Sequence, residues 1–457
     1  MNAITMQAQT HVLRLLVLAV LLLGFSAALG VKSQHMHVAT VRPLATKGAL
    51  VSRGVIPPTD AQCRATASQR PCYSPQEIRN AYGVTPLIDR GFTGKGQTIV
   101  IIDSFGSPTL ANDLKVFDKG YGLPDPPQLT ILSPLGTVPF DPTNSDQQGW
   151  ASETTLDVEW AHALAPDANI LVMTSPISET QGVQGLPEFL FLEKYAVNQH
   201  LGQIISQSWT ATENTLFDKA GKYTIGQFEN FYKEAVKAHV TIFASSGDSG
   251  AANPDVNGKI YPFPTVGYPA SSPYVTGVGG TSLFTDTKGN YQSEVVWDEP
   301  ARIEGSGGGI SQYFAEPDYQ KQTLPEADQQ LLKGHRGVPD ISYNGDPRTS
   351  ILIYLSAPGN TPGYYRIGGT SEGSPQWAAI IADANQYAHH ALGFLNPALY
   401  KLGSDKDQAA EVYHDVTVGD NGVTGVAGYK ATPGWDATTG WGTPNAAQLV
   451  NELSNLA

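Results

Sequence analysis

Four short segments of the chain carry side chains that could take part in hydrolysis. The first is GGTSEGSPQW (368–377), in which Ser371 lies between a glycine-rich turn and an apolar segment, AAIIADANQY, that reads as a helix. A serine at a helix start presents its hydroxyl beside backbone N–H groups that can stabilise an oxyanion. Helix-capping serines share this pattern, so spacing alone favours a cap over a nucleophile.

The second segment, SETTLDVEW (152–160), holds a pair of acids. Glu153 and Asp157 are four residues apart on a predicted helix, so their carboxylates share one face. Two like charges this close raise one pKa, which suits a general acid or base that works in acidic conditions. A solvated acidic first turn is the alternative, and Glu159 fits that alternative better.

The third segment, SSGDSGA (245–251), places Asp248 between two glycines after a predicted buried strand. A carboxyl group that stays protonated there could donate a hydrogen bond to a developing oxyanion. An ordinary aspartate in a turn is the competing interpretation.

The fourth region lies near the C-terminus, in HDVTVGDNG (414–422) and ATPGWDATTGWGTP (431–444). Asp415 and Asp436, each flanked by glycine-rich loops, can offer carboxylate and backbone oxygens to a hard cation such as calcium. A turn-rich loop without metal would have the same composition.

Alternating strands and helices must position these segments. Short apolar runs end in polar or glycine-rich turns, with helical stretches between them. Strands are predicted at 94–103, 169–175, 203–209 and 240–250, and helices around 151–165, 186–198 and 226–238. A further helix is predicted to start at Ser74-Pro75. This alternation predicts an α/β fold with a doubly wound, mostly parallel sheet and helices on both faces. Sites in such sheets gather at the carboxyl ends of the strands, near Asp103, Trp209 and Asp248.

Composition and the N-terminal region limit the class of protein. The net charge of −14 over 457 residues argues against a nucleic-acid partner. Residues 1–30, with the apolar run LLVLAVLLLG, are predicted to be a signal peptide, and an uncleaved anchor is the alternative. We expect a short prosegment or linker arm at 31–74 and one large catalytic domain at 75–457. After signal cleavage, no stable membrane association is expected.

The chain has two cysteines, Cys63 and Cys72. An even count in a secreted chain favours one local disulfide, which would fix the arm and not carry the fold. No histidine pair with zinc-site spacing lies nearby.

Taken in order, E-x-x-x-D, S-G-D-S-G, G-T-S-x-x-x-P and the C-terminal D-V and G-W-D pair resemble the sedolisin family of serine-carboxyl peptidases, over roughly residues 75–450. The resemblance implies a subtilisin-like fold that works at acid pH. Ser371 would be the nucleophile and Glu153 its general base. Asp157 would orient Glu153, and a protonated Asp248 would belong to the oxyanion hole.

The resemblance also implies one structural calcium ion. Asp415 and Asp436 would supply carboxylate oxygens, and Val416, Thr432 and Gly434 would supply backbone oxygens. With one water, this set gives about six oxygen ligands, within the usual range for calcium.

Asp103 and Trp209 fall where the family extends its carboxylate network. An ordinary neutral subtilisin-type protease is the nearest rival, with Asp103 as the triad acid and Ser371 as nucleophile. Such an enzyme needs a catalytic histidine, and His162 is the only candidate in the right region. The family usually carries a long folded prosegment, for which the 31–74 segment is short.

Two rivals from other classes remain open. One is a catalytically inactive binding module on the same scaffold. The other is a carbohydrate-active enzyme, although Glu153 and Asp157 are too close in sequence to flank a sugar ring. We therefore expect a secreted, acid-acting, monomeric endopeptidase that cleaves polypeptide substrates through an acyl-enzyme at Ser371.

Overall fold

The computed structural model describes residues 46–65, 69–423 and 425–456 of the chain. The predicted signal peptide and residues 31–45 lie outside the described residues, so the signal peptide stays a prediction. All the described residues belong to one compact unit. None of the helices within the described ranges is both long enough and apolar enough to cross a bilayer.

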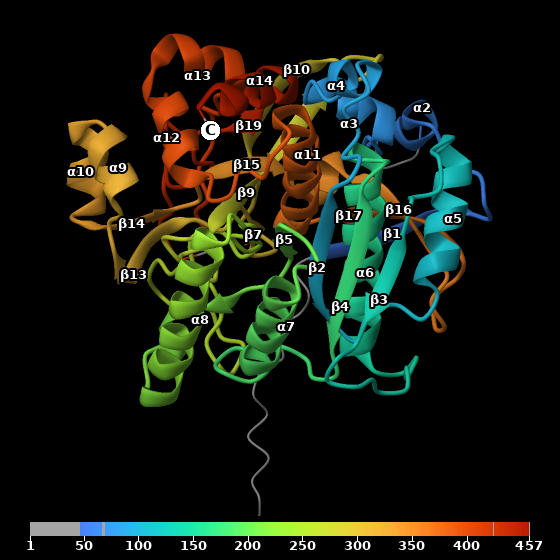
Figure 1. The fold of residues 1–457 in the computed structure, drawn as a ribbon, viewed down its shortest axis with the longest axis horizontal. Helices are drawn as coiled ribbons and strands as arrows, with labels where there is room; N and C mark the ends of the chain where they lie inside the picture. The colour runs from blue at the N-terminus through green and yellow to red at the C-terminus, as the bar shows by residue number, and fades with distance from the viewer. Residues whose placement is uncertain (1–45, 66–68, 424, 457) are drawn as a thin grey trace, which may run out of the picture. The chain divides into compact units, whose positions relative to one another are not determined.

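The main sheet confirms the predicted doubly wound, mostly parallel architecture (Figure 1). Across the described ranges it has eight strands in the order β10-β9-β7-β5-β2-β4-β3, with β15 also paired to β9. All neighbouring pairs are parallel except β10 with β9. The strands are β2 (Thr98–Ser104), β3 (Leu129–Leu132), β4 (Asn169–Ser175), β5 (Ile204–Gln207), β7 (Thr241–Ser245), β9 (Thr276–Thr285), β10 (Tyr291–Val296) and β15 (Ile341–Asn344).

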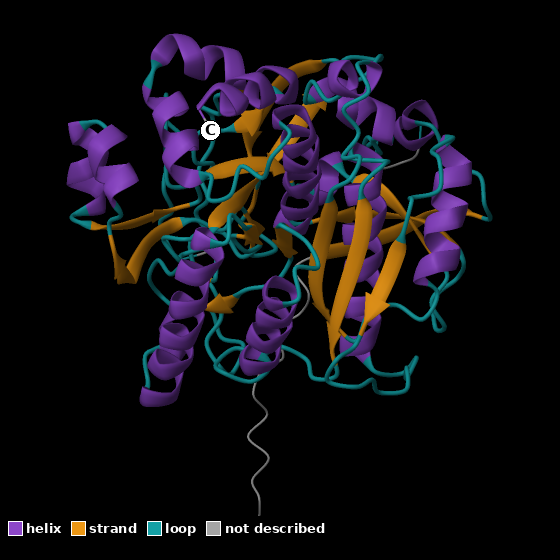
Figure 2. Ribbon diagram, in the orientation of Figure 1, coloured by secondary structure: helices purple, strands orange, loops and turns teal. Residues whose placement is uncertain are grey.

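Helices cover both faces of this sheet, as Figure 2 shows. Along β2, Ile99 and Ile101 join one apolar core, whereas Val100 and Ile102 join a second. Successive side chains of a strand point to opposite faces, so each core lies on one side of the sheet. The first core contains α6 (Ser145–Leu164) and α11 (Gly373–Ala388), and the second contains α7 (Leu186–Asn198) and α8 (Lys219–Lys237).

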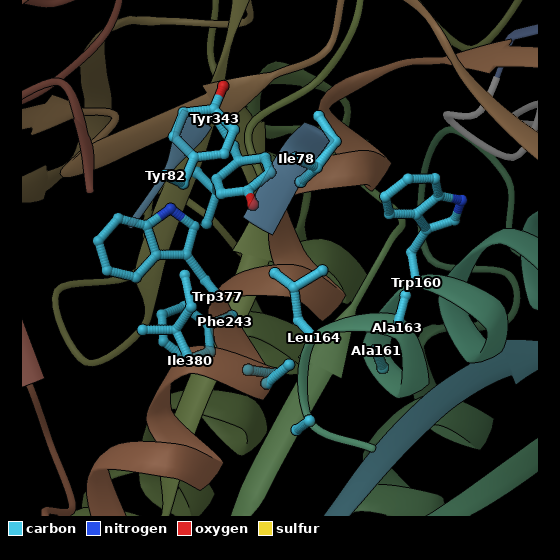
Figure 3. Close-up of a cluster of buried hydrophobic side chains, with 14 of the residues drawn as sticks. Ile78, Tyr82, Trp160, Ala161, Ala163, Leu164, Phe243, Tyr343, Trp377 and Ile380 are labelled. Atoms are coloured by element: carbon cyan, nitrogen blue, oxygen red, sulfur yellow. The ribbon is translucent and has the colours of Figure 1, made fainter. Parts of the chain in front are cut away.

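Large aromatic side chains fill the first core, and Figure 3 shows part of it. Trp160 and Leu164 come from α6, and Trp377 comes from α11; all three are fully buried. The Trp160 indole also donates to the Leu352 carbonyl across 2.9 Å. Packing of this kind fixes α6 and α11 against each other.

A second, three-stranded sheet with the order β1-β17-β16 packs against α6. Its strands are β1 (Thr46–Arg53), β16 (Ile351–Leu355) and β17 (Gly363–Gly368). Strand β1 lies inside the segment that the sequence analysis predicted to be a short prosegment or linker arm. The strand was not predicted because its sequence, TKGALVSR, lacks a clear alternation of apolar and polar residues.

Helix α6 corrects one detail of the sequence analysis. It begins at Ser145, with the Asn144 side chain accepting from the Asp146 and Gln147 backbone N–H groups. Glu153 therefore lies in the middle of the helix and not in its first turn. Glu159 is fully buried and accepts from the Tyr354 N–H at 3.0 Å, so the interpretation of a solvated acidic turn is wrong.

The N-terminal region confirms two local predictions. Cys63 and Cys72 form a disulfide. Helix α3 (Pro75–Ala81) begins after Ser74, which forms a capping box with Glu77.

The remaining elements complete the described chain. They are α2 (Asp60–Arg64), α4 (Thr85–Asp89), α5 (Leu110–Tyr121), β6 (Ala211–Thr212), η1 (Glu213–Leu216), β8 (Gly267–Tyr268), β11 (Asp298–Glu299), β12 (Glu304–Gly305), β13 (Gly309–Ala315), α9 (Asp318–Thr323), α10 (Glu326–Leu332), β14 (His335–Val338), η2 (Pro347–Thr349), η3 (Thr370–Glu372), α12 (Asn396–Ser404), α13 (Lys406–Val412), β18 (Tyr413–His414), β19 (Thr443–Pro444) and α14 (Ala446–Leu456).

Candidate active site

Three buried carboxyl groups lie together where α6 crosses the carboxyl end of β2. Glu153 and Asp157 come from α6, Asp103 comes from the end of β2, and all three are fully buried. Burial, together with the charges of Asp103 and Glu153, holds the pKa of Asp157 well above its usual value. Burial raises the pKa of Asp103 to about 7. Asp103 and Asp157 therefore keep their protons in conditions where isolated carboxyls are ionised.

The hydroxyl of Ser208 fixes one oxygen of this group. Ser208 directly follows β5 and donates to Asp157 Oδ1 at 2.9 Å. A hydrogen bond of this kind orients the carboxyl of Asp157 without neutralising it.

Ser371 lies in the short turn η3, between β17 and α11. The turn is entered through Gly369, whose φ of 128° is a backbone conformation that residues with a Cβ rarely adopt. Helix α11 starts at Gly373, its N-cap residue is Glu372, and no side chain makes a capping bond. The interpretation of Ser371 as a helix cap is therefore wrong. Its Oγ is buried and has no hydrogen-bond partner among the described residues.

Asp248 is bonded directly to the turn that holds Ser371. Its Oδ1 accepts from the Thr370 backbone N–H at 2.8 Å and from the Thr370 hydroxyl at 2.7 Å. Its Oδ2 is out of contact with solvent and has no hydrogen-bond partner within the described ranges. Burial raises the pKa of Asp248 to about 7. Below that pH this carboxyl carries a proton that it can donate.

The elements that carry these groups pack against one another. Turn η3 contacts α6, and α11 contacts both α6 and β5. The Ser374 hydroxyl, one turn after Ser371, lies 2.9 Å from the Ser206 hydroxyl and accepts from the Gln207 N–H at 3.3 Å. The structure thus brings the predicted nucleophile, the acid pair and Asp248 to the carboxyl ends of the central strands of the main sheet.

Sequence reasoning missed two residues that organise this end of the sheet. Thr370 anchors Asp248, and Ser208 holds Asp157. Thr370 is the threonine of the G-T-S motif, and Ser208 directly precedes Trp209 in the sequence. Thr370 contacts a residue 122 positions away, and Ser208 contacts one 51 positions away. Spacing along the chain does not reveal such contacts.

Trp209 and His162, the two other candidates from the sequence, have structural surroundings. Trp209 is fully buried and packs against Phe189, with ring centroids 4.6 Å apart. His162 is fully buried, and its Nε2 lies 2.7 Å from the Pro124 carbonyl oxygen and 3.4 Å from Asp118 Oδ1. Burial lowers the pKa of His162 to about 4. The partners of His162 are thus Pro124 and Asp118, and no histidine of the described ranges is hydrogen-bonded to the Ser371 hydroxyl.

The predicted calcium ligands lie on two neighbouring segments. Asp415 and Val416 follow β18, and the loop 432–436 precedes β19. The Gly434 N–H donates to Asp415 Oδ2 at 2.9 Å and joins the two segments. Asp436 Oδ1 accepts a hydrogen bond from the Thr438 N–H at 2.9 Å, and Asp436 Oδ2 accepts one from the Thr432 N–H at 3.2 Å.

The predicted ligand set has the chemistry of a site for a hard cation. Two carboxylates and three backbone carbonyls offer only oxygen, which suits calcium. No cluster of three or more His, Cys, Asp or Glu side chains arranged for a metal occurs in the parts of the chain that the structure describes.

Comparison with known proteins extends these observations. The profile of the subtilase family (Peptidase_S8) matches residues 141–409. Kumamolisin of Bacillus sp. (strain MN-32) is 32% identical over 396 residues, which are 86% of this chain and 65% of kumamolisin. Sedolisin of Pseudomonas sp. (strain 101) is 31% identical over 365 residues, which are 78% of this chain and 58% of sedolisin. The chain thus spans less than two thirds of the length of these relatives.

A solved structure shows the same fold. The structure of Pseudomonas sedolisin, a serine-carboxyl proteinase complexed with two molecules of pseudo-iodotyrostatin, superimposes with a TM-score of 0.67 at 28% identity. The superposition covers 84% of this chain and 98% of that chain.

The buried carboxyls predict an unusual dependence of stability on pH. Asp103, Asp248 and Glu229 each have a folded-state pKa of about 7, above the usual value for the unfolded chain. The folded chain then binds more protons than the unfolded chain between about pH 4 and 7, so the free energy of unfolding falls as pH rises. Each tenfold difference in proton affinity contributes ~1.4 kcal/mol.

We expect a lower urea midpoint at pH 7.5 than at pH 4.5, measured in excess calcium to hold metal occupancy constant. Asp103→Asn should weaken this dependence, because the amide does not titrate. A midpoint that rises from pH 4.5 to pH 7.5 would contradict the assignment of buried, protonated carboxyls.

Proposed function

Because the chain belongs to the subtilase family, and within it to the sedolisins, we propose that it hydrolyses peptide bonds with Ser371 as nucleophile. One observation carries the proposal. The Ser371 hydroxyl has no hydrogen-bond partner among the described residues, and its turn is bonded to Asp248 Oδ1 through Thr370. A nucleophile and an oxyanion donor therefore belong to one rigid unit.

In the proposed reaction, Glu153 accepts the proton of Ser371 Oγ as the oxygen attacks the substrate carbonyl carbon. The oxyanion that forms accepts a hydrogen bond from protonated Asp248. Glu153 then gives its proton to the leaving amine as the C–N bond breaks, which leaves an acyl-enzyme. Water, deprotonated by Glu153, releases the acid product and restores the Ser371 hydroxyl.

Asp157 acts through Glu153. It lies one helical turn further along α6, and Ser208 fixes one of its oxygens at 2.9 Å. Burial and neighbouring charge favour its protonated form. In that form it can donate to Glu153 and keep the base ionised and oriented.

Acid pH is the proposed working range. Asp248 can donate only while protonated, and its pKa of about 7 sets the upper limit. As pH rises through that value, the carboxyl loses its proton and repels the developing oxyanion. Glu153 can accept the Ser371 proton only while its own carboxyl is ionised.

We further propose that the protein is a secreted, monomeric endopeptidase. The disulfide between Cys63 and Cys72 is typical of proteins that mature outside the cytosol. The apolar run at 15–24 has the pattern of a signal peptide. Endopeptidase action is tested by mass spectrometry of a digested denatured protein, since release of tripeptides alone would exclude it.

A structural calcium ion is proposed at the loops described above, held by Asp415 and Asp436 with the carbonyls of Val416, Thr432 and Gly434. When bound, the ion would neutralise the two carboxylates and tie the two segments together. The segment that follows this loop is also connected to the candidate site. The Thr438 carbonyl accepts from the Ser306 hydroxyl at 2.7 Å, and the neighbouring Gly305 N–H donates to the Asp248 carbonyl at 2.9 Å.

Activity on a denatured protein substrate, followed from pH 2 to 8, tests the reaction. Ser371→Ala and Glu153→Gln should each lower kcat by roughly ten-thousand-fold, because the nucleophile and its base act as one unit. Asp146→Asn, on the same helix but partly exposed, should keep the wild-type rate and serves as control. Full activity in Ser371→Ala, or a peak near neutrality that survives Glu153→Gln, would overturn the mechanism.

Chelation tests the calcium proposal. Exhaustive treatment with a chelator should lower Tm by several degrees, and added calcium should restore it, because a ligand present at 100 times its Kd adds about 2.7 kcal/mol. In Asp415→Asn and Asp436→Asn, calcium should no longer raise Tm. The exposed Asp407→Asn should respond like wild type. A Tm that chelation leaves unchanged would count against the site.

A further inference from the structure

The segment that precedes the catalytic unit is built into the fold. We call residues 46–65 and 69–73 the strap. Its strand β1 pairs antiparallel with β17, from Thr46 opposite Gly368 to Arg53 opposite Gly363. This makes β1 the edge of the β1-β17-β16 sheet, and every residue of β17 is buried. Without the strap, β17 would lose the hydrogen-bond partners along one side.

A buried cation on β17 depends on the strap for its acceptors. Arg366 is 8% exposed, and its Nη2 donates to the Arg70 carbonyl at 2.7 Å. Its Nη1 donates to the Pro71 carbonyl and, at 3.0 Å, to the Ser350 hydroxyl. No carboxylate lies within 4 Å of this guanidinium in the described residues. Two of the three acceptors that hold this guanidinium therefore belong to the strap, and loss of the strap would remove both.

The other end of the strap is tied to the same sheets. Cys63 and Cys72 are both buried and form the disulfide. The Cys72 N–H donates to Asp60 Oδ1 at 2.9 Å, within the strap. The Tyr73 N–H donates to the Ser350 carbonyl at 2.9 Å, and the Tyr73 hydroxyl donates to the Leu283 carbonyl at 2.8 Å. These bonds anchor the strap beside β16 and β9.

Strand β17 leads directly to the candidate nucleophile. It ends at Gly368, and Ser371 follows three residues later, after Gly369 and Thr370. The Gly369 N–H donates to the Gly345 carbonyl at 2.6 Å, and Thr370 bonds Asp248. The position of the Ser371 turn is therefore set from one side by β17, and β17 is held by the strap.

We propose that the strap is a permanent part of the catalytic unit, which positions the Ser371 turn through β1 and Arg366, and that the active protein retains it. Arg366 is then a positioning residue that acts through β17 and touches no substrate. The opposite behaviour is that of an inhibitory prosegment, whose release starts activity. The tests that measure kcat rest on the proposed peptidase function, whereas the exchange measurement described below does not.

A cleavable strap separates these two behaviours. A recognition site for a specific protease, inserted between Arg64 and Arg70 in the full chain, lies inside the loop closed by the disulfide. Cleavage alone leaves residues 46–65, the β1 part of the strap, covalently attached through Cys63 and Cys72, and reduction then removes that link. Residues 70–73, with the Arg70 and Pro71 carbonyls, stay on the catalytic part, so removal of the strap in this experiment means release of the β1 part, and the Arg366 contacts are tested separately. Uncleaved protein treated with the same reductant is the matched control. Intact mass and gel filtration report whether the strap is still bound.

We expect full activity after cleavage and in the reduced, uncleaved control. Once the strap has been removed, kcat should fall by at least ~100-fold, the cost of misplacing a catalytic group by about 1 Å. A strap that stays bound after cleavage and reduction also supports the proposal, since a prosegment meant for release should leave. Unchanged or increased activity in strap-free protein would overturn it.

Hydrogen–deuterium exchange gives a readout that does not require catalysis. Removal of the strap should speed exchange of the backbone amides of β17 and of residues 369–372. If intact protein cleaves no peptide, the proposed function fails, but this exchange result still decides the strap. Unchanged exchange in 363–372 would overturn the positioning role.

Point variants test Arg366 in the intact chain. Arg366→Met keeps most of the apolar stem and removes the donors, so kcat should fall ~10–100-fold with KM little changed. Arg366→Lys, which can still donate to one strap carbonyl, should lose less. Arg53→Met, at an exposed position of β1, is the matched control and should keep the wild-type rate. Equal rates for Arg366→Met and Arg53→Met would contradict the role of Arg366.

Discussion

The burial of α6 between two sheets is the constraint on which the rest of the structure depends. Its inner side packs on the main sheet, and β16 covers its outer side through the Leu352 carbonyl and the Tyr354 N–H. A helix held in this way carries Glu153, Asp157 and Glu159 into the interior, where water cannot stabilise their charges. Raised pKa values follow from this burial, and so does a site whose chemistry depends on protonated carboxyls.

The Ser371 turn is held from three directions, which explains how one hydroxyl can be presented without a hydrogen-bond partner. Thr370 ties the turn to Asp248, Ser374 ties α11 to β5, and β17 leads into the turn from the strap side. The segment that follows the predicted calcium loop is connected to the same region through Ser306, whose hydroxyl donates to the Thr438 carbonyl. The neighbours of Ser306, Gly305 and Gly307, donate their N–H groups to the carbonyls of Asp248 and Gly247. Rigid positioning of this kind lowers the reorganisation needed at the transition state.

The sequence predicted those parts of the fold that local pattern determines. Strand 169–175 agrees with β4 at both ends because it is a continuous apolar run, and the Ser74 capping box marks the start of α3. Strand β1, the burial of Glu159 and the true start of α6 were missed, since each depends on packing against distant segments. At the site, spacing alone favoured a cap at Ser371; only the ordered set of motifs indicated a nucleophile. The anchoring of Asp248 by Thr370 joins residues 122 apart and could not be read from either motif.

The proposed mechanism requires that Asp248 stays protonated across the acidic range and offers that proton to an oxyanion. Infrared difference spectroscopy between wild type and Asp248→Asn, recorded during a pH titration, measures this directly through the C=O stretch of the protonated carboxyl. We expect the band assigned to Asp248 to persist up to about pH 7, because burial raises the pKa of this carboxyl to about 7. Disappearance of the band near pH 4, the range of a solvated aspartate, would contradict it.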